Sequence, residues 1–285
     1  MAGKQPIGIF DSGIGGLTVF RSIAAQLPDY DYIYLGDNSR APYGNRSFNT
    51  IHQYTWECVQ WLFQQGCPLI ILACNTASAK ALRTIQQKDM KSLDPSKRVL
   101  GVIRPTAEVI GEYSNTKEIG VLGTVGTVKS ESYLIEIKKF FPDLKVYQQA
   151  CPLWVPLVES GEYEKPGSDY FIQEYLDELM RQSTHIDTIL LACTHYPLLQ
   201  DKIEEHLPKG IKVIAQGDIV AKSLVDYLKR HPELEQKLTK TGTREFYTTT
   251  DDTAEFDHHA SRFFSAPVKS TFVSVTEFSC KQGLM

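Results

Sequence analysis

Two cysteines, Cys74 and Cys193, stand in closely similar segments of this 285-residue chain. Residues 70–76 read IILACNT and residues 189–195 read ILLACTH, so each cysteine ends an apolar run and precedes two polar residues. A free thiol with a pKa of about 8.5 is mostly neutral at pH 7, but a helix that begins just after it favours the thiolate. A single such cysteine is more often an inert core residue. Two with matched flanks predict a pair of perturbed thiols that serve one site.

The neighbours of these cysteines carry groups that suit an acid–base site for a carboxylate. Asn75, Thr76 and Thr194 offer hydrogen-bond donors. His195 is either an orienting or proton-exchanging partner of Cys193 or a satisfied core histidine. Glu159, within the apolar segment VPLVESG, is by itself an ordinary helix-surface or capping residue.

A glycine-rich segment, DSGIGG at residues 11–16, follows the first apolar run. A strand, a glycine-rich turn and a helix start expose backbone N–H groups to an anion. The dinucleotide fingerprint is excluded because Thr18 occupies its third glycine position, and no G-K-[ST] phosphate loop is present. The turn therefore either holds a small anion such as a carboxylate or is a structural turn capped by Asp11 or Ser12, and the glycines alone favour the structural turn.

Three other features have ordinary structural explanations when each is taken alone. The tripeptide Pro42-Tyr43-Gly44 is a turn whose glycine would also allow a ligand to approach the backbone. His258 and His259 lie among polar residues and are expected at the surface. Cys58 lies on the apolar face of a predicted helix and is expected in the core.

Short apolar runs alternate with amphipathic stretches along the chain. The runs predict strands at residues 6–10, 32–35, 69–73, 99–103, 119–122, 189–192 and 211–214, and helices are predicted at 16–27, 48–65, 77–89, 129–141, 168–181, 197–206 and 217–230. Such an alternation predicts an α/β fold whose mainly parallel sheets are covered on both faces. Ligands of these sheets bind beyond the carboxyl ends of the strands. The residues expected there are Asp11, Ser12, Cys74, Gly123, Thr124 and Cys193.

The composition limits the function classes. The charged fraction of 22% and the net charge of −4, with both signs interspersed, give no basic surface for nucleic acid. There is no apolar stretch of signal-peptide or membrane-span length, so a cytoplasmic protein without a membrane partner is expected. None of the cysteines has CxxC spacing, which argues against a zinc site, and a reducing compartment argues against disulfides. The six are Cys58, Cys67, Cys74, Cys151, Cys193 and Cys280.

Six segments together resemble the glutamate racemase family, a branch of the aspartate/glutamate racemase superfamily. They are FDSGIGGLTV (10–19), GDNSRAPYG (36–44), LACNTASA (72–79), GVLGT (120–124), CPLWVPLVESG (151–161) and LACTHYPLL (191–199), in the family's order. Each segment is short, but the ordered set is specific. The C-terminal part of the chain matches less clearly.

The resemblance implies two similar α/β domains with the active site in the cleft between them. The first would hold residues 1–102 and 216–285, and the second residues 103–215. It also implies that L- and D-glutamate are interconverted without a cofactor or a metal, supplying D-glutamate for peptidoglycan. One cysteine would remove the Cα proton as a thiolate, and the other would return a proton to the opposite face as a thiol. Cys74 would act on D-glutamate and Cys193 on L-glutamate.

The same resemblance assigns roles to the neighbouring residues. Asp11 would assist Cys74, and His195 with Glu159 would assist Cys193. The substrate-binding residues would be Asp11, Ser12, Pro42, Tyr43, Gly44, Asn75, Thr76, Thr124 and Thr194, with Thr127 as an alternative to Thr124. Two departures from the family pattern are an extension at residues 88–97, expected to be a loop, and a short N-terminus. The segment through which a cell-wall precursor activates some members is therefore expected to be absent.

Three alternatives remain open from the sequence. Aspartate racemases share the two-thiol chemistry, and pocket size decides between the two substrates. A cysteine hydrolase using Cys193 and His195 would leave Cys74 idle. A carboxylate-binding protein would need the glycine turn but neither thiol. The sequence also leaves the oligomeric state open, with a homodimer as one candidate.

Overall fold

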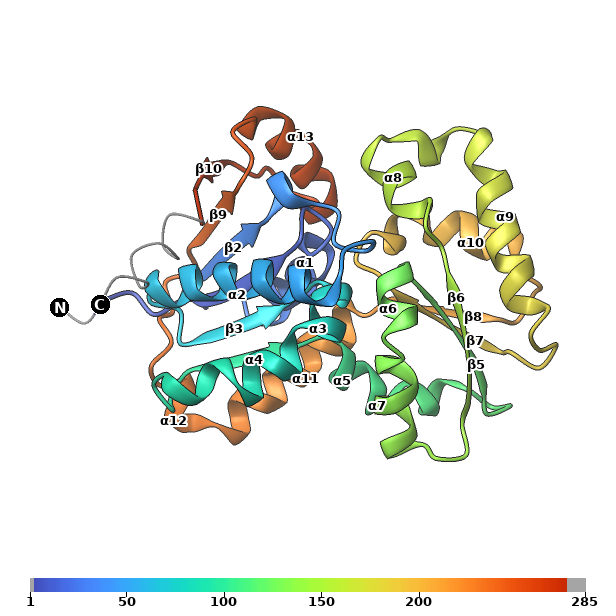
Figure 1. The fold of residues 1–285 in the computed structure, drawn as a ribbon, viewed down its shortest axis with the longest axis horizontal. Helices are drawn as coiled ribbons and strands as arrows, with labels where there is room; N and C mark the ends of the chain where they lie inside the picture. The colour runs from blue at the N-terminus through green and yellow to red at the C-terminus, as the bar shows by residue number, and fades with distance from the viewer. Residues whose placement is uncertain (1–2, 276–285) are drawn as a thin grey trace.

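The computed structural model describes residues 3–275, and its strands form two separate sheets. One sheet has six strands in the order β10-β9-β2-β1-β3-β4, and the other has four in the order β6-β5-β7-β8. Every strand pair is parallel, which confirms the predicted α/β class. We call the six-stranded sheet with its helices the large-sheet unit, and the four-stranded sheet with its helices the small-sheet unit. They lie side by side at the left and right of Figure 1.

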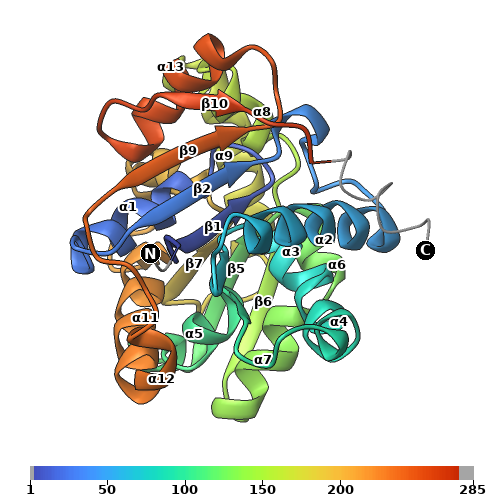
Figure 2. The ribbon, with the colours of Figure 1, turned by 90° about the vertical axis from the view of Figure 1, so that its left-hand side faces the viewer.

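The large-sheet unit buries both faces of its sheet, because alternate strand residues point to opposite sides. Ile7 and Ile9 pack with helices α1, α11 and α13, whereas Phe10 packs with α2, α3 and α4 on the other face (Figure 2). The strands are β1 (Ile7–Asp11), β2 (Tyr32–Gly36), β3 (Leu69–Leu72), β4 (Arg98–Gly101), β9 (Arg244–Thr248) and β10 (Ser270–Phe272). The helices are α1 (Leu17–Gln26), α2 (Phe48–Gln64), α3 (Asn75–Lys80), α4 (Leu82–Gln87), α11 (Gly217–Arg230), α12 (Pro232–Glu235) and α13 (Thr253–Phe264).

The small-sheet unit is built in the same way. Ile119 and Leu190 pack on one face with α5 and α7, and Ile189 and Leu191 pack on the other with α8, α9 and α10. The strands are β5 (Glu118–Gly123), β6 (Lys145–Ala150), β7 (Thr188–Ala192) and β8 (Lys212–Ile214). The helices are α5 (Ile103–Ala107), α6 (Val125–Lys129), α7 (Ser132–Phe140), α8 (Trp154–Glu159), α9 (Gly167–Met180) and α10 (Gln200–His206).

The structure differs from the predicted elements in three strands, in helices α8 and α13, which were not predicted, and at the crossing between the units. Strands β6, β9 and β10 were not predicted, and every residue of β6 is at least partly exposed, so it forms no apolar run. The predicted helix 77–89 is two helices that meet at Ala81. The predicted strand 99–103 ends at Gly101, because Ile103 already begins helix α5 of the small-sheet unit. The extension at residues 88–97 contains one 3-10 turn, Asp89–Ser92.

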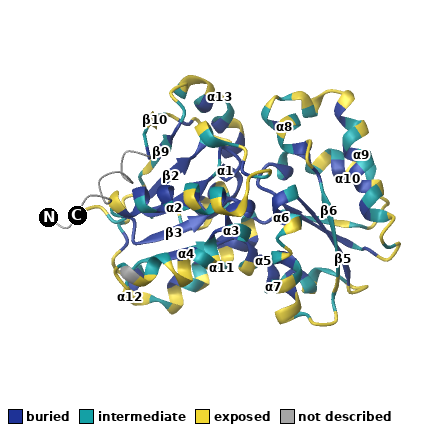
Figure 3. Cartoon of the chain, in the orientation of Figure 1, coloured by how far each residue is buried: buried dark blue, intermediate teal, exposed yellow. Residues whose placement is uncertain are grey.

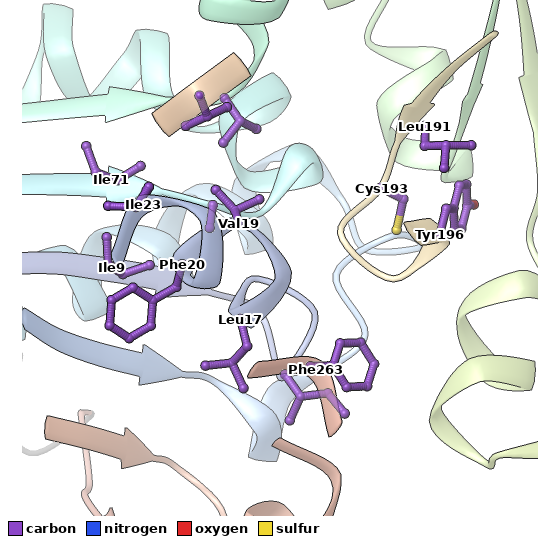
Figure 4. Packing of buried hydrophobic residues seen from close by; sticks show 14 of the residues in the cluster. Ile9, Leu17, Val19, Phe20, Ile23, Ile71, Leu191, Cys193, Tyr196 and Phe263 are labelled. Carbon is purple, nitrogen blue, oxygen red and sulfur yellow. The ribbon is translucent and has the colours of Figure 1, made fainter. Parts of the chain in front are cut away.

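Burial follows the two sheets. Figure 3 shows buried residues along the strands and exposed residues on the outer helices. Within residues 3–275 none of the helices has the length and apolar character that a membrane crossing requires. Cys280 lies outside the described residues. One hydrophobic cluster continues from the large-sheet unit into the small-sheet unit, and Figure 4 shows Cys193 on the side of the small-sheet unit that faces Leu17 and Phe263.

Candidate active site

Cys74 follows β3 and is the N-cap residue of the six-residue helix α3. Its Sγ accepts a hydrogen bond from the Ala77 N–H at 3.4 Å and lies 3.4 Å from the Ser12 hydroxyl oxygen. Burial, and then the negative charge of Asp11, raises the pKa of Cys74 to about 12. The Ala77 N–H at the helix start lowers the pKa of Cys74, as predicted, but burial and Asp11 outweigh it.

Asp11 is the last residue of β1 and is fully buried. Its Oδ2 accepts a hydrogen bond from the Gly13 N–H at 3.0 Å, whereas Oδ1 has no hydrogen-bond partner among the described residues. Burial raises the pKa of Asp11, although the nearby His195 opposes this. A buried carboxyl group with a raised pKa beside a cavity is a candidate for a functional role. Asp11 is thus the titratable group on the Cys74 side.

Cys193 follows β7 and has a different set of partners. Its Sγ lies 4.0 Å from Nδ1 of His195, and Nε2 of the same ring lies 3.0 Å from Oε1 of Glu159, the last residue of α8. Burial lowers the pKa of His195, but the hydrogen bonds to Cys193 and Glu159 outweigh it and raise the pKa above its ordinary value. The helix predicted at residues 197–206 begins with a 3-10 turn, Tyr196–Leu199, and continues as α10. The imidazolium of His195 is the positive group beside the Cys193 sulfur.

Three threonine hydroxyls meet between the two units. Thr76 Oγ1, from α3, lies 2.9 Å from Thr124 Oγ1, the N-cap residue of α6. Thr127 Oγ1 lies 3.1 Å from Thr124 Oγ1 and 3.5 Å from Thr76 Oγ1. Thr124 lines the cavity described below, whereas Thr127 is fully buried behind it. The geometry therefore favours Thr124 over Thr127 as the residue that a ligand can reach.

A buried carboxylate that the sequence analysis did not single out anchors Tyr43. Tyr43 donates a hydrogen bond to Oδ2 of Asp37 at 2.5 Å, and Asp37 also accepts from Arg40 at 2.7 Å and from Thr249 at 2.8 Å. Asp37 directly follows strand β2, so its strand-end position was the available signal. Gly44 follows Tyr43 in the cavity wall. A Cβ on Gly44 would lie 3.2 Å from Cβ of Thr124, so this turn also contacts the small-sheet unit.

The glycine-rich turn after β1 docks the loop that carries Cys193. A Cβ on Gly15 would lie 2.4 Å from both Nδ1 of His195 and Oγ1 of Thr194, closer than real Cβ atoms approach. The Thr18 hydroxyl, one turn further on, donates a hydrogen bond to the Thr194 carbonyl at 2.9 Å. Close approach of the two units therefore explains why Gly15 is a glycine.

These groups surround a cavity of about 70 Å³ between the units. Among the predicted site residues only Asp11 does not line it. Those that do are Ser12, Pro42, Tyr43, Gly44, Cys74, Asn75, Thr76, Thr124, Glu159, Cys193, Thr194 and His195. Lining residues that the sequence did not mark include Cys151, Pro152, Val155 and Pro156. Cys151 has no polar side chain beside it in the sequence, so nothing there distinguishes it from a core cysteine.

A larger cavity, of about 570 Å³, lies among helices α4, α5, α7 and α11 and contains none of the predicted site residues. The smaller cavity is the better candidate for chemistry, because it combines two thiols, an imidazole and a carboxylate. His258 is exposed and Cys58 is fully buried in the core, as expected. Within residues 3–275 no three His, Cys, Asp or Glu side chains are grouped so as to hold a metal ion.

Comparison with known proteins gives one consistent result. The sequence profile of the Asp/Glu/Hydantoin racemases matches residues 7–224. A glutamate racemase of Sulfurihydrogenibium sp. is 43% identical over 254 residues, which are 89% of this chain and 91% of that protein. The crystal structure of a glutamate racemase isoform from Bacillus anthracis has a TM-score of 0.85 and 33% identity, covering 95% of this chain and 97% of its own.

A second solved structure, that of glutamate racemase from Francisella tularensis in complex with D-glutamate, has a TM-score of 0.84 and 30% identity. The alignment covers 96% of this chain and 99% of that one. Sequence and structure thus agree over nearly the whole length of both chains. The chain belongs to the glutamate racemases within the Asp/Glu/hydantoin racemase family, and it is an amino-acid racemase.

Proposed function

We propose that the protein interconverts L-glutamate and D-glutamate, with Cys74 and Cys193 as its two acid–base groups. The observation that carries the proposal is the opposite electrostatic setting of two thiols that line one cavity. Burial and Asp11 raise the pKa of Cys74 to about 12, whereas Cys193 lies 4.0 Å from His195, whose pKa is raised to about 10. We assign Cys74 as the acid and Cys193 as the base in the reaction of L-glutamate, because proton exchange on opposite faces of one carbon requires both.

In the proposed reaction of L-glutamate, the Cys193 thiolate takes the Cα proton and becomes a thiol. The electron pair stays on the substrate, where donors to the α-carboxylate stabilise the developing charge. The Cys74 thiol then gives its proton to the opposite face and becomes a thiolate. D-glutamate follows the same steps in reverse, and proton exchange with water restores the starting state. The steps balance without a cofactor or a metal.

The residues that line the cavity support binding of a dicarboxylic amino acid. We assign the hydroxyls of Ser12, Thr76, Thr124 and Thr194 to the substrate carboxylates, because each lies in the cavity wall. Asp11 lies behind this wall and not in it, so we assign it to Cys74, whose thiol its charge influences. The turn residues Pro42, Tyr43 and Gly44 form another part of the cavity wall, and Asn75 also lines the cavity.

We propose that the two units separate when the substrate enters, because the cavity between them is small, about 70 Å³, and its walls come from both units. We propose that the units move as two domains, with residues 1–102 and 216–285 in one and 103–215 in the other. The cleft between them would then close around glutamate and exclude water, which strengthens the electrostatic interactions inside it.

The proposed cellular role is to supply D-glutamate for peptidoglycan in a bacterial cytoplasm. Glutamate is the proposed partner, and neither nucleic acid nor a membrane is required. A homodimer is the assembly to examine, and light scattering of the purified chain measures it directly.

Proton exchange in heavy water tests the proposed function. The purified protein is incubated in D₂O with a chelator and with L-glutamate, D-glutamate or either enantiomer of aspartate, and the Cα–H signal is followed by NMR. We expect loss of the Cα–H signal and formation of the opposite enantiomer with glutamate. Absence of Cα exchange would overturn the proposal. Faster exchange with aspartate would assign the chain to aspartate instead, and a cleaved product would support the hydrolase.

A further inference from the structure

A closed ring of three side-chain hydrogen bonds lies directly behind the cavity. Asn75 Nδ2 donates to Gln216 Oε1 at 2.8 Å, Gln216 Nε2 donates to the Tyr133 hydroxyl at 2.6 Å, and that hydroxyl donates to Asn75 Oδ1 at 2.5 Å. Each member donates to the next, so the bonds reinforce one another. The ring uses one N–H and one oxygen lone pair of the Asn75 amide. The second N–H is left for the cavity that Asn75 lines.

The ring joins every segment by which the two units are connected. Asn75 is the first residue of α3 and follows Cys74, and Tyr133 lies in α7 of the small-sheet unit. Gln216 precedes α11, where the chain returns to the large-sheet unit. Its Nε2 also donates to Thr106 at 2.8 Å in α5, where the chain first crosses, and Thr106 donates to the Val102 carbonyl at 2.9 Å.

The ring is sealed from water, and its members are matched in hydrogen-bonding capacity. Asn75, Thr106, Tyr133 and Gln216 are all buried, with at most 3% of any of them exposed. Burial raises the pKa of Tyr133 far above its ordinary value, so its hydroxyl remains a donor. A buried amide that loses one partner is left unsatisfied, so the loss of any one member destabilises the arrangement of the others.

We propose that Gln216 and Tyr133 are positioning residues for racemisation, which hold the Cys74 end of α3 in a fixed place relative to the small-sheet unit. The inference rests on the proposed function, in which Cys74 and Cys193 must face the same carbon atom from opposite sides. Both residues act through Asn75 and neither lines the cavity. Because the carboxylate-binding hydroxyls lie outside the ring, its loss disturbs the placement of the bases more than the binding of substrate.

The test compares two substitutions that each remove one buried phenolic hydroxyl. Tyr133→Phe opens the ring, whereas Tyr32→Phe removes a hydroxyl that donates to the Leu27 carbonyl at 2.7 Å, away from the cavity. Misplacement of a catalytic group by about 1 Å costs about 100-fold in rate. We therefore expect Tyr133→Phe to lower kcat about 10- to 100-fold with KM changed less than about threefold, and Tyr32→Phe to leave kcat nearly unchanged. Thermal unfolding of both variants measures the loss of stability separately.

A second variant, Gln216→Met, keeps the side-chain length and opens the same ring at a different member. If the ring acts as a unit, the double variant with Tyr133→Phe has a kcat close to that of the worse single variant. A kcat that equals native in folded Tyr133→Phe, or effects of the two substitutions that multiply fully, would overturn the proposal.

Amide hydrogen exchange separates this proposal from the proposed function. The Ser78 N–H donates to the Cys74 carbonyl at 2.9 Å and reports on the place of that residue. We expect its exchange to accelerate in both ring variants and not in Tyr32→Phe. Unchanged exchange would overturn the ring proposal whether or not the native protein racemises glutamate. An inactive native protein with accelerated exchange in the variants would instead contradict only the proposed function.

Discussion

The two sides of the cavity share a sequence pattern but differ in electrostatics. Cys74 and Cys193 each follow a buried strand and an alanine, Ala73 or Ala192, at the carboxyl edge of its own sheet. The Cys74 side has the buried carboxyl group of Asp11, which disfavours a second negative charge. The Cys193 side has His195, whose raised pKa keeps a positive charge beside the sulfur. Matched strands therefore deliver two chemically different thiols.

This difference matters because two thiols in the same protonation state could not carry out the proposed reaction. Two thiolates would leave no acid, and two thiols would leave no base. The helix-start argument from the sequence treats both cysteines alike and so misses the distinction. The protein obtains it from the residue beside each sulfur. This is Asp11 at the end of β1 on one side and, on the other, His195, which Glu159 at the end of α8 holds by a hydrogen bond.

The largest expected effect comes from removing either thiol. Cys74→Ser and Cys193→Ser should each lower racemisation by roughly 10³-fold or more, because one proton transfer loses its acid–base group. Each variant should still abstract a proton from one enantiomer. Elimination of HX from β-substituted glutamate should persist for the L form in Cys74→Ser and for the D form in Cys193→Ser, and chiral chromatography and halide release measure the two activities.

Cys67→Ser is the matched control for this pair, because Cys67 is also buried and lies just before β3, at the end opposite Cys74. Its racemisation should equal that of the native protein. Full racemisation by either Cys74→Ser or Cys193→Ser would contradict the assignment of both thiols as acid–base groups.

The next effect concerns the partners that make the two thiols different. Asp11→Asn and His195→Asn should each lower kcat/KM for racemisation by roughly 10²-fold. The two enantiomers have equal free energies, so kcat/KM falls equally in both directions, and only single-enantiomer elimination reveals the side affected. Asp11→Asn should mainly impair the D form and His195→Asn the L form. Equal loss for both forms in both variants would contradict the assignment of one partner to each side.

The central strands and the strand-end residues could be predicted from the sequence, for a common reason. β1, β3 and β7 are buried on both faces, so their apolar runs are unbroken and the polar residues at their ends stand out. The edge strand β6, with the sequence KVYQQA, has no such contrast and was missed. Burial on both faces leaves a local trace in the sequence, whereas the partly exposed strands β6 and β9 form no unbroken apolar run.

Contacts between residues far apart in the chain could not be predicted. The fit of Gly15 against His195 and the ring through Gln216 join the two units, and the bond of Glu159 to that imidazole joins distant segments of the small-sheet unit. The raised pKa of Cys74 has the same origin, because its cause is burial at the junction of the units. Only the family resemblance pointed to Glu159, and nothing in the sequence pointed to Gln216.

A smaller effect is expected where the glycine turn presses on the Cys193 side. Gly15→Ala should lower kcat/KM roughly tenfold and stability by about 1–3 kcal/mol, since the new Cβ forces His195 and Thr194 to move. Gly13→Ala is the control within the same turn, because a Cβ there meets nothing closer than 3.7 Å. Steady-state kinetics and thermal unfolding of the two variants make the comparison. Equal behaviour of Gly13→Ala and Gly15→Ala would show that the close approach does not matter.

The smallest effect on kcat is expected for Glu159→Gln. This substitution tests whether Glu159 supports the charged His195 beside Cys193. The Glu159 side chain is 36% exposed, so its ion pair with His195 is partly screened and kcat should fall only about two- to fivefold. The substitution removes the second of the two hydrogen bonds that raise the pKa of His195. The imidazolium is then lost at a lower pH, and the alkaline limb of the pH–rate profile should move to lower pH while the acid limb stays in place.

The free energy of unfolding should depend on pH in a way that reflects the raised pKa of His195. A folded-state pKa raised above its unfolded value stabilises the protein below the unfolded value, and this contribution is lost as pH rises through the folded value. The difference in stability between native protein and Glu159→Gln should therefore be present near pH 6 and vanish at alkaline pH, as thermal unfolding across pH measures. A difference that grows with pH, or an alkaline limb that moves upward, would mean that Glu159 does not support a charged His195. The contrast between the two thiols would then have to come from Asp11 alone.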